Sequence, residues 1–372
     1  MCGAQNAGLG RYIEELIIEL QRIDTQNEYV LFLKRDNWDS VAHTDRFTKV
    51  LADIHWYGFE EQIKFTQIIK KADVDVMHFV HWNVPLTYTD PYVVTMHDLI
   101  MYHYPRREAS TLGPLAYWIK DKVMRRVVNH AVRRAERIIV TSEFTKHDIH
   151  ETLGVPLENM SVIYQAPSKH ISTQNECNTV LSKLNIKTPF VLYVGNSYPH
   201  KNISGLLDAW QEFVHTYPDN YQLVLAGKEN FFYKKIKQTI NPDLKSSVIF
   251  TGFVSDNDIA CLYKHAKLFV FPSLYEGFGL PPLEAMKFGV PVVSSNAACM
   301  PEVLGEGAYY ADARDPQALS EAMHRVLSDD DLRYELLERA REELLRYSAE
   351  RFASQTLDIY THARRQASKS ST

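Results

Sequence analysis

Short apolar runs alternate with amphipathic segments along the whole chain. The apolar runs cover residues 29–33, 74–80, 92–96 and 137–141 in the first half, and 190–195, 221–227, 248–252, 267–271 and 290–294 in the second. Continuous apolar runs of this length, separated by segments of helical periodicity, are typical of parallel strands covered by helices on both faces. The pattern therefore predicts an α/β protein with two doubly wound domains. Ligands of such sheets bind at the carboxyl ends of strands, so we expect the active site in a cleft between the domains.

A stretch of weak periodicity separates the two predicted domains. It is flanked by prolines and holds several serines, threonines and asparagines, a composition typical of loops. The predicted divisions are an N-terminal Rossmann-like domain over residues 1–167, a linker over 168–187, a C-terminal Rossmann-like domain over 188–346 and a final helix over 347–365.

Composition narrows the class of protein. At 372 residues the chain is long enough for two domains with separate cores. A net charge of −5 argues against a nucleic-acid-binding protein, which would normally be basic. No apolar run approaches the ~20 residues of a membrane span, and the N-terminus lacks the order of a secretory signal, so we expect a cytoplasmic protein. Cys2, Cys177, Cys261 and Cys299 are far apart, and we expect four reduced thiols.

Residues 272–289 combine a glycine loop, two acids and a helix start. The stretch follows an apolar run and contains two glycines and then two prolines. Proline suits the first turn of a helix and glycine the position after its end, so we predict strand, loop and a two-turn helix. The N–H groups at such a helix start bind phosphate or sugar hydroxyls. Glu276 in the loop and Glu284 in the helix can accept hydrogen bonds from hydroxyls without a metal ion.

These glutamates, eight residues apart around Gly-Phe-Gly-Leu-Pro, resemble the E-x7-E signature of the family 4 retaining glycosyltransferases, which have the GT-B architecture. The resemblance implies two Rossmann-like domains facing a cleft, a final helix that returns to the N-terminal domain, and transfer of a hexose from a nucleoside diphosphate sugar. It implies that Glu284 holds the donor ribose. It also implies that Glu276 binds the sugar together with the loop backbone of Gly277, Phe278, Gly279 and Leu280.

A lysine follows the first predicted strand of the C-terminal domain. Residues 195–202 read GNSYPHKN and precede a predicted helix, where a lysine can neutralise a diphosphate together with backbone donors. Lys201, followed by Asn202, is similar to the family's diphosphate lysine. His200 replaces the usual neighbour, so the charge delivered to the donor stays open. We expect Lys201→Ala to lose turnover by orders of magnitude with little loss of fold.

Residues 252–259, GFVSDNDI, resemble the family's turn in which backbone atoms, here at Val254, meet the nucleobase. The same residues are also typical of a strand end followed by a helix capped at Ser255 or Asp256. Both interpretations can hold together.

His97 ends a predicted strand, where a side chain enters the expected cleft. A single histidine at such a place is more often structural, but the resemblance implies that His97 hydrogen-bonds the transferred sugar. Near the N-terminus, Gly8 and Gly10 form a glycine loop before a predicted helix. The resemblance implies that they lie against the donor phosphates and the acceptor, although a tight turn alone would also explain them. The family's first strand would precede this loop and is not in this sequence, so we expect either a misassigned start or a missing strand.

The identity of the donor is open on the sequence alone. Residues 97–105, HDLIMYHYP, are similar to bacterial mannosyltransferases of surface polysaccharide assembly, so we expect mannose from GDP-mannose. UDP-glucose, UDP-N-acetylglucosamine and dTDP-rhamnose are alternatives. Asp73 and Asp75 could form the D-x-D metal motif of the GT-A architecture, but Asp75 begins an apolar strand, whereas a metal-binding pair would follow one. We therefore expect no metal and no other cofactor.

Expected partners are a nucleotide-sugar donor and a glycan or lipid-linked saccharide acceptor, with no nucleic acid. Residues 119–137 place Ile119, Val123, Val127, Ala131 and Ala135 on one helix stripe among basic residues. An anionic membrane surface is a further candidate partner for this helix, and a location at the inner face of the membrane would follow. A solvated helix face is the alternative. Two other classes also remain, a non-catalytic or truncated nucleotide-sugar-binding protein and a glycoside hydrolase that uses Glu276 and Glu284.

Overall fold

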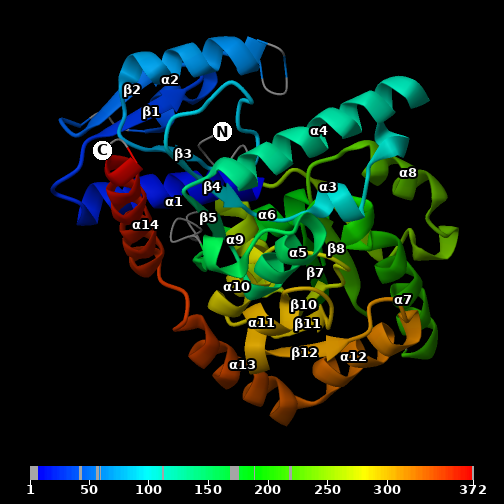
Figure 1. The fold of residues 1–372 in the computed structure, drawn as a ribbon. Coiled ribbons are helices and arrows are strands. Elements are labelled where there is room, and N and C mark those ends of the chain that lie inside the picture. The colour runs from blue at the N-terminus through cyan, green and yellow to red at the C-terminus, as the bar shows by residue number, and fades with distance from the viewer. Residues whose placement is uncertain are drawn as a thin grey trace. The chain divides into compact units, whose positions relative to one another are not determined.

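The computed structural model describes all residues except 1–6, 42–43, 56–57, 59, 111–112, 168–175, 188, 218–219 and 371–372. The chain divides into two compact units (Figure 1). Unit 1 comprises Met1–Leu99, Ser110–Ala166 and Ser348–Thr372, and unit 2 comprises Ile100–Ala109 and Pro167–Tyr347. The short segment Ile100–Ala109 therefore belongs to a different unit from the residues on either side of it.

Unit 2 is built on a six-stranded parallel sheet. Its strands are β7 (Phe190–Val194), β8 (Gln222–Ala226), β9 (Val248–Gly252), β10 (Leu268–Phe271), β11 (Val292–Ser295) and β12 (Ala308–Ala311). Their order across the sheet is β12-β11-β10-β7-β8-β9. The chain thus starts in the middle of the sheet, runs to one edge, and returns to continue from β10 to the other edge. This is the doubly wound arrangement, and its topological switch point lies between β7 and β10.

The helices of unit 2 are amphipathic and several have side-chain caps. They are α3 (Ile100–His103), α6 (Cys177–Lys183), α7 (Ile203–Thr216), α8 (Phe231–Thr239), α9 (Asp256–His265), α10 (Leu280–Lys287), α11 (Met300–Leu304), α12 (Pro316–Ser328) and α13 (Asp330–Leu344). The side chains of Asn230, Ser255, Asp315 and Asp329 accept from backbone N–H groups at the starts of α8, α9, α12 and α13. Helix α7 packs against α12, and α6 against α9. The central strands β7 and β10 are fully buried at Val191, Leu192, Phe269 and Val270, as expected for strands covered on both faces.

Unit 1 contains two parallel sheets. One pairs β1 (Tyr29–Leu33) with β2 (Phe47–Leu51), and the other has the order β3-β4-β5-β6, formed by Met77–Phe79, Tyr92–Met96, Arg137–Val140 and Met160–Val162. Its helices are α1 (Ala7–Ile23), α2 (Thr66–Ala72), α4 (Pro114–Arg134), α5 (Glu143–Leu153) and α14 (Ala349–Ser370).

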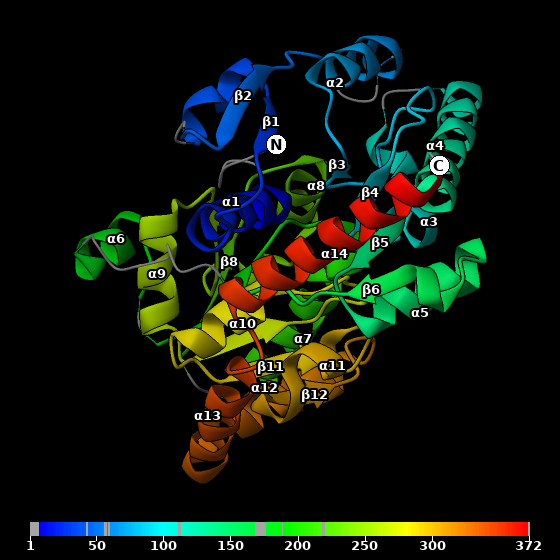
Figure 2. The ribbon, with the colours of Figure 1, turned by 60° about the vertical axis from the view of Figure 1, so that its left-hand side comes forward.

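The core of unit 1 joins the two ends of the chain. Helix α14, at the red end of the ribbon, lies beside the blue helix α1 in both views (Figures 1 and 2). Phe352 of α14 packs on Tyr12 of α1, with ring centroids 4.9 Å apart. Arg22 also pairs with Glu350 at 2.6 Å. The last helix is therefore part of the core that α1 forms with β1 and β2.

Most predicted strands are present, and three short ones were missed. The apolar runs at residues 29–33, 92–96 and 248–252 coincide with β1, β4 and β9, whereas β3 is shorter than the predicted run. Strands β2 and β6 were not predicted because polar residues interrupt their short apolar runs, and β12 was missed because its apolar run, AYYA, is only four residues long. The predicted absence of a first strand concerns residues before Ala7, which lie outside the described residues, and stays a prediction.

Two local expectations at the N-terminus and the cysteines were wrong. Helix α1 begins at Ala7, so Gly8 and Gly10 lie in its first turns rather than in a loop before it.

Cys177 and Cys261 form a disulfide that joins α6 to α9, with Cα atoms 5.1 Å apart. The two cysteines are 84 residues apart in sequence, and only the packing of α6 on α9 brings them together. Cys299 is a buried free thiol, and Cys2 lies outside the described residues.

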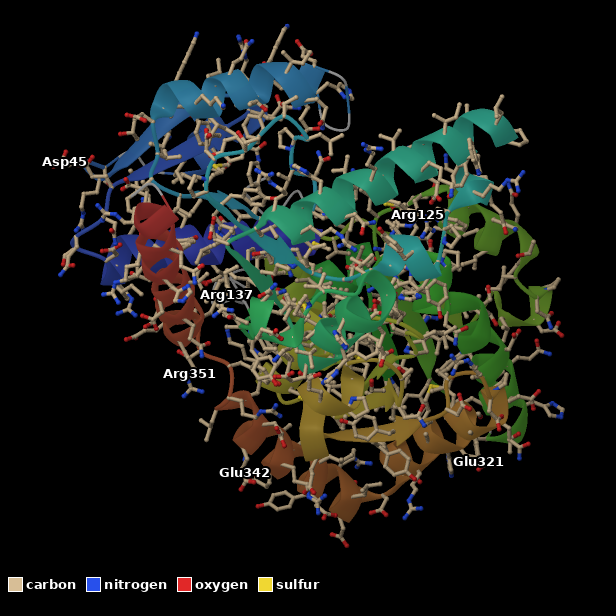
Figure 3. All side chains as sticks on the ribbon, in the orientation of Figure 1. Asp45, Arg125, Arg137, Glu321, Glu342 and Arg351 are labelled. Atoms are coloured by element: carbon tan, nitrogen blue, oxygen red, sulfur yellow. A yellow bond between two sulfur atoms is a disulfide. The ribbon has the colours of Figure 1, made fainter. Side chains whose placement is uncertain are left out.

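The apolar stripe predicted on helix α4 is buried over only part of its length. Val127 and Ala131 are buried in unit 1, but Ile119 and Val123 are exposed, together with Leu115 and Trp118. The exposed apolar residues thus occupy the first three turns of the helix, and the buried ones its second half. Arg125, which Figure 3 labels on this helix, pairs with Asp121 at 2.7 Å. Within the described part of the chain, none of the helices has the length and hydropathy needed to span a bilayer.

Candidate active site

The strand order of unit 2 brings two predicted site segments together. Strands β7 and β10 are neighbours, with Val191 paired to Leu268 and Leu192 to Phe269. The turn that carries Lys201 follows β7, and the loop that carries Glu276 follows β10, so both leave the sheet at its carboxyl edge. Lys201 forms an ion pair with Glu276, and the exposed fractions of the two side chains are 13% and 8%. A buried ion pair therefore occupies the switch point, where doubly wound sheets bind ligands.

The turn that holds Lys201 is fixed by Asn202. Asn202 has a positive φ of 57°, a conformation that asparagine tolerates better than most residues. Its side-chain amide donates to the carbonyl oxygen of Ala313 at 2.6 Å. Gly205 leaves room for this side chain, because a Cβ there would lie 2.6 Å from Asn202 Oδ1. The Lys201 ammonium also lies 5.3 Å from the centroid of the Phe271 ring. Asn202 therefore acts on the site by shaping the turn.

The loop that holds Glu276 is tied down through its backbone. The Leu274 N–H donates to the carbonyl oxygen of His200 at 2.7 Å, which links the loop to the lysine turn. The Cys299 thiol donates to the carbonyl oxygens of Glu276 and Phe278 at 3.2 and 3.3 Å. Burial, and then the Glu276 carboxylate, raise the pKa of Cys299 well above its usual range. Cys299 therefore stays a neutral thiol and serves as a donor to the loop.

Gly279 is the point at which the loop becomes helix α10. Its φ of 92° is a conformation that L side chains rarely adopt, and a Cβ there would lie 2.5 Å from Met300 Cε. Helix α10 begins at Leu280, and Pro281 and Pro282 occupy its first turn, where a missing N–H costs no intrahelical bond. The predicted sequence of strand, glycine loop and two-turn helix is thus present.

Glu284 is a second buried acid at the same edge of the sheet. It lies on α10 with 2% of its surface exposed. The hydroxyl of Tyr263, on α9, donates to Glu284 Oε2 at 2.9 Å. The sequence indicated Glu284 but gave no sign of Tyr263, because the two residues meet only through the packing of their helices.

Val254 lies beyond the carboxyl end of β9, half-buried in the loop that leads to α9. Ser255 caps α9 by accepting from the Asp258 N–H at 3.3 Å, so the capping interpretation is confirmed. The nucleobase contact at Val254 stays a prediction.

His97 follows β4 in unit 1, and both of its ring nitrogens have partners. Nε2 donates to the Val80 carbonyl oxygen at 3.0 Å, and the Gln165 amide approaches Nδ1 at 3.4 Å. The Tyr12 ring packs edge-on against the imidazole at 4.7 Å. Burial lowers the pKa of His97 to about 4, so the ring is neutral near pH 7. The short bond at Nε2 fixes the tautomer and leaves Nδ1 as the acceptor atom.

A buried polar network lies beside His97. His78 Nε2 and the Tyr12 hydroxyl both contact Thr95 Oγ1, at 2.8 and 3.0 Å, and His78 Nδ1 contacts the Tyr360 hydroxyl at 2.6 Å. Burial, followed by the interaction with His97, lowers the pKa of His78 to about 3. The network links α1, β3, β4 and α14 within unit 1, and sequence patterns gave no indication of it.

The predicted site residues thus fall into two groups. Lys201, Asn202, Val254, the loop from Glu276 to Leu280, and Glu284 share the carboxyl edge of the unit 2 sheet. His97, Gly8 and Gly10 belong to unit 1. The described residues contain no group of three side chains that could hold a metal ion. Asp73 ends helix α2, and Asp75 pairs with Arg364 at 3.3 Å.

Solved structures share this fold. Sucrose-phosphate synthase from Thermosynechococcus elongatus superposes with a TM-score of 0.75 at 21% identity, over 95% of this chain and 93% of that one. The Anabaena protein HepE, solved in complex with UDP and glucose, gives a TM-score of 0.74 at 18% identity, over 97% and 98% of the two chains. The fold is that of the GT-B glycosyltransferases.

Sequence comparisons identify the family. The model described as Glycosyl transferases group 1 matches residues 180–343, and the model described as Glycosyltransferase Family 4 matches residues 7–166. O-antigen chain mannosyltransferase B of Escherichia coli is 32% identical over 274 residues, 72% of this chain and 69% of that protein. O-antigen chain mannosyltransferase RfbU of Salmonella typhimurium is 28% identical over 77% of this chain and 74% of that protein. The chain belongs to the family 4 glycosyltransferases and is an enzyme of that kind, as the E-x7-E stretch predicted.

Proposed function

We propose that the enzyme transfers mannose from GDP-mannose, with retention of configuration, to a hydroxyl of a glycan or lipid-linked saccharide. The observation that supports it best is the Lys201–Glu276 ion pair at the switch point of unit 2, next to the start of α10. The names of the two relatives, both O-antigen chain mannosyltransferases, favour mannose. Family membership favours a transferase over the hydrolase and over the non-catalytic binder.

The chemistry that we propose is electrostatic. Lys201 stabilises the diphosphate as it leaves, and preorganised charge of this kind often lowers the reaction barrier more than any other single effect. Glu276 binds sugar hydroxyls together with the backbone of Gly277, Phe278, Gly279 and Leu280. The acceptor hydroxyl attacks from the face that the diphosphate leaves, and a phosphate oxygen accepts its proton. Configuration is then retained without a covalent intermediate on the protein.

The remaining contacts are proposed from the resemblance to the family. Glu284, oriented by Tyr263, accepts from the ribose hydroxyls, and the backbone at Val254 meets the base. In unit 1 His97 accepts from a sugar hydroxyl through Nδ1, in place of the Gln165 amide that approaches this atom at 3.4 Å, because its Nε2–H is already bonded to the Val80 carbonyl oxygen. Gly8 and Gly10 are proposed to leave space for phosphates and acceptor at the start of α1.

The test is release of nucleoside diphosphate from a panel of GDP-, UDP- and dTDP-sugars in EDTA, with and without a lipid-linked saccharide extract. We expect release from GDP-mannose that rises with the extract, and an α-linked product by NMR. Release from a UDP- or dTDP-sugar would contradict mannose as the transferred sugar but would still support a glycosyltransferase. Release that requires added Mg²⁺ or Mn²⁺ would contradict the expectation that the enzyme needs no metal, and inversion at the anomeric carbon would contradict retention.

We also propose peripheral contact with an anionic membrane at the cytoplasmic face, through the first three turns of α4. Leu115, Trp118, Ile119 and Val123 are exposed there, with exposed fractions from 50% to 72%. Lys120, Lys122 and Arg126 are exposed beside them on the same helix. Apolar side chains interleaved with basic ones suit the headgroup region, where each basic residue contributes about 1 kcal/mol.

Vesicle co-sedimentation tests this contact. We expect Trp118→Ser to weaken binding to phosphatidylglycerol vesicles and high salt to reduce it. Leu345→Ser is the matched control, because Leu345 is also exposed, at 78%, but belongs to unit 2 and not to α4. An equal loss of vesicle binding in both variants, or binding that does not change with salt concentration, would contradict the role of α4.

A further inference from the structure

The segment Ile100–Ala109 is attached to unit 2 beside the candidate site. Glu108 pairs with Lys235 of α8 at 3.0 Å. The ring of Tyr104 lies 5.8 Å from that of His200, and the ring of His103 lies 5.2 Å from that of Tyr275. His200 and Tyr275 are the residues that directly precede Lys201 and Glu276. The segment therefore packs against both halves of the ion-pair site.

Arg106 lies in this segment, and its guanidinium is stacked on the lysine turn. Its central carbon is 3.5 Å from the centroid of the Tyr198 ring, and that ring is stacked with His200 at 6.1 Å. Arg106 Nε is buried and has no hydrogen-bond partner among the residues that the structure describes. A buried N–H without an acceptor is costly, and a stacked guanidinium presents its donors in the fixed fork that suits phosphate.

The charges at the switch point do not by themselves favour an anion. The charge of Lys201 is opposed by Glu276. His200 adds none near pH 7, because burial, followed by the charges of Lys201 and Arg106, lowers its pKa to about 3. A departing diphosphate brings several negative charges. The charge of Arg106 would change the net charge at this turn from neutral to positive.

We propose that Arg106 binds a phosphate oxygen of the donor diphosphate, together with Lys201, and supplies the charge that His200 does not. This inference rests on the function proposed above. The same guanidinium could bind the diphosphate of a lipid-linked acceptor. The donor is favoured because Arg106 is stacked on the turn that carries Lys201.

The test compares Arg106→Gln with Arg107→Gln, which removes the same charge from the exposed neighbour of Arg106. The probe is whichever of GDP, UDP and dTDP the wild type binds by calorimetry, with its nucleoside as a second probe. Loss of a charged hydrogen bond predicts roughly 10- to 100-fold weaker binding of the diphosphate in Arg106→Gln. Binding of the nucleoside should stay unchanged, and Arg107→Gln should bind like the wild type. Arg106→Lys keeps the charge and should recover part of the loss.

The outcomes distinguish a failure of the proposed function from a failure of the role of Arg106. A wild type that binds no nucleoside diphosphate overturns the proposed function and the role of Arg106 with it. A wild type that binds, with equal affinity in Arg106→Gln, overturns the role of Arg106 alone. Weaker binding of geranyl diphosphate with unchanged nucleoside diphosphate binding would assign Arg106 to the acceptor instead. If Arg106→Gln melts below the wild type, the Arg106→Lys comparison decides, because it preserves the cation over Tyr198.

Discussion

Substitutions of Lys201 and Glu276 test the site best, because their effects on stability and on catalysis can be measured separately. From the sequence alone Lys201 is expected to be removable with little loss of fold. The structure changes that expectation, because Lys201→Met would leave Glu276 as an unpaired carboxylate in a side chain that is only 8% exposed. Removing one partner of a buried ion pair typically costs about 3–5 kcal/mol. Glu276→Gln should cost a similar amount, since it leaves the lysine unpaired.

The double variant Lys201→Met with Glu276→Gln should recover most of this stability. Neither side chain is then charged, and neutral replacement of a buried pair often changes the free energy of unfolding little. Activity should not recover with stability, because the departing diphosphate still lacks the Lys201 ammonium group. We expect nucleotide release to stay roughly 100- to 1,000-fold below wild type in the double variant, as for the loss of one preorganised electrostatic group.

The assay measures urea unfolding and nucleotide release for the wild type, the two single variants and the double variant. Lys237→Met is the control, because Lys237 pairs with Glu229 at 2.6 Å but both side chains are well exposed, at 36% and 43%. An exposed pair of this kind contributes at most about 1 kcal/mol. The reasoning fails if Lys201→Met unfolds at the same urea concentration as the wild type, or if the double variant is no more stable than the single variants. An active double variant would refute the role of Lys201 in catalysis.

Three further results are expected. Stability should fall by roughly 4–6 kcal/mol between pH 8 and pH 5.5, because burial keeps four histidines neutral in the folded state while the unfolded chain binds protons below about pH 6.5. Urea unfolding across this range checks it, and a flat profile would contradict the lowered pKa values of His78, His81, His97 and His200. Reduction of the Cys177–Cys261 disulfide should cost roughly 4–5 kcal/mol by loop entropy, given the sequence separation of 84. Alkylation of both cysteines without reductant would show that the bond is absent. Tyr263→Phe should raise the KM for the donor about tenfold by removing a hydrogen bond to buried Glu284, and an unchanged KM would separate Glu284 from donor binding.

The sequence predicted what depends on local pattern. Continuous apolar runs located the central strands, since a strand buried on both faces admits few polar residues. The prolines and glycines around Glu276 located the start of α10 because their backbone preferences are local. The helix start at Ala7 was missed for the converse reason, since Gly8 and Gly10 have poor helix propensity and are held in α1 by the packing of the residues that follow.

What the sequence did not predict depends on contacts between distant residues. Cys177 and Cys261 meet because α6 packs on α9, and no spacing rule applies to a pair so far apart. The stripe on α4 is exposed in its first turns and buried further on, because periodicity shows that a helix has an apolar stripe but not which part of it is covered. Tyr263, Cys299 and Arg106 had no motif of their own, and each reaches the site through tertiary packing.

The topology of unit 2 explains why some candidates cooperate. Lys201 and Glu276 are motif residues on separate strands, and nothing in either motif requires them to meet. They meet because the order β12-β11-β10-β7-β8-β9 makes β7 and β10 neighbours at the point where the chain reverses its direction across the sheet. Any segment that packs at that point can add a functional group without belonging to a motif. Ile100–Ala109 packs there, and Arg106 lies just after the HDLIMYHYP stretch, which is why the missing charge is better sought at Arg106 than in the residues around His200.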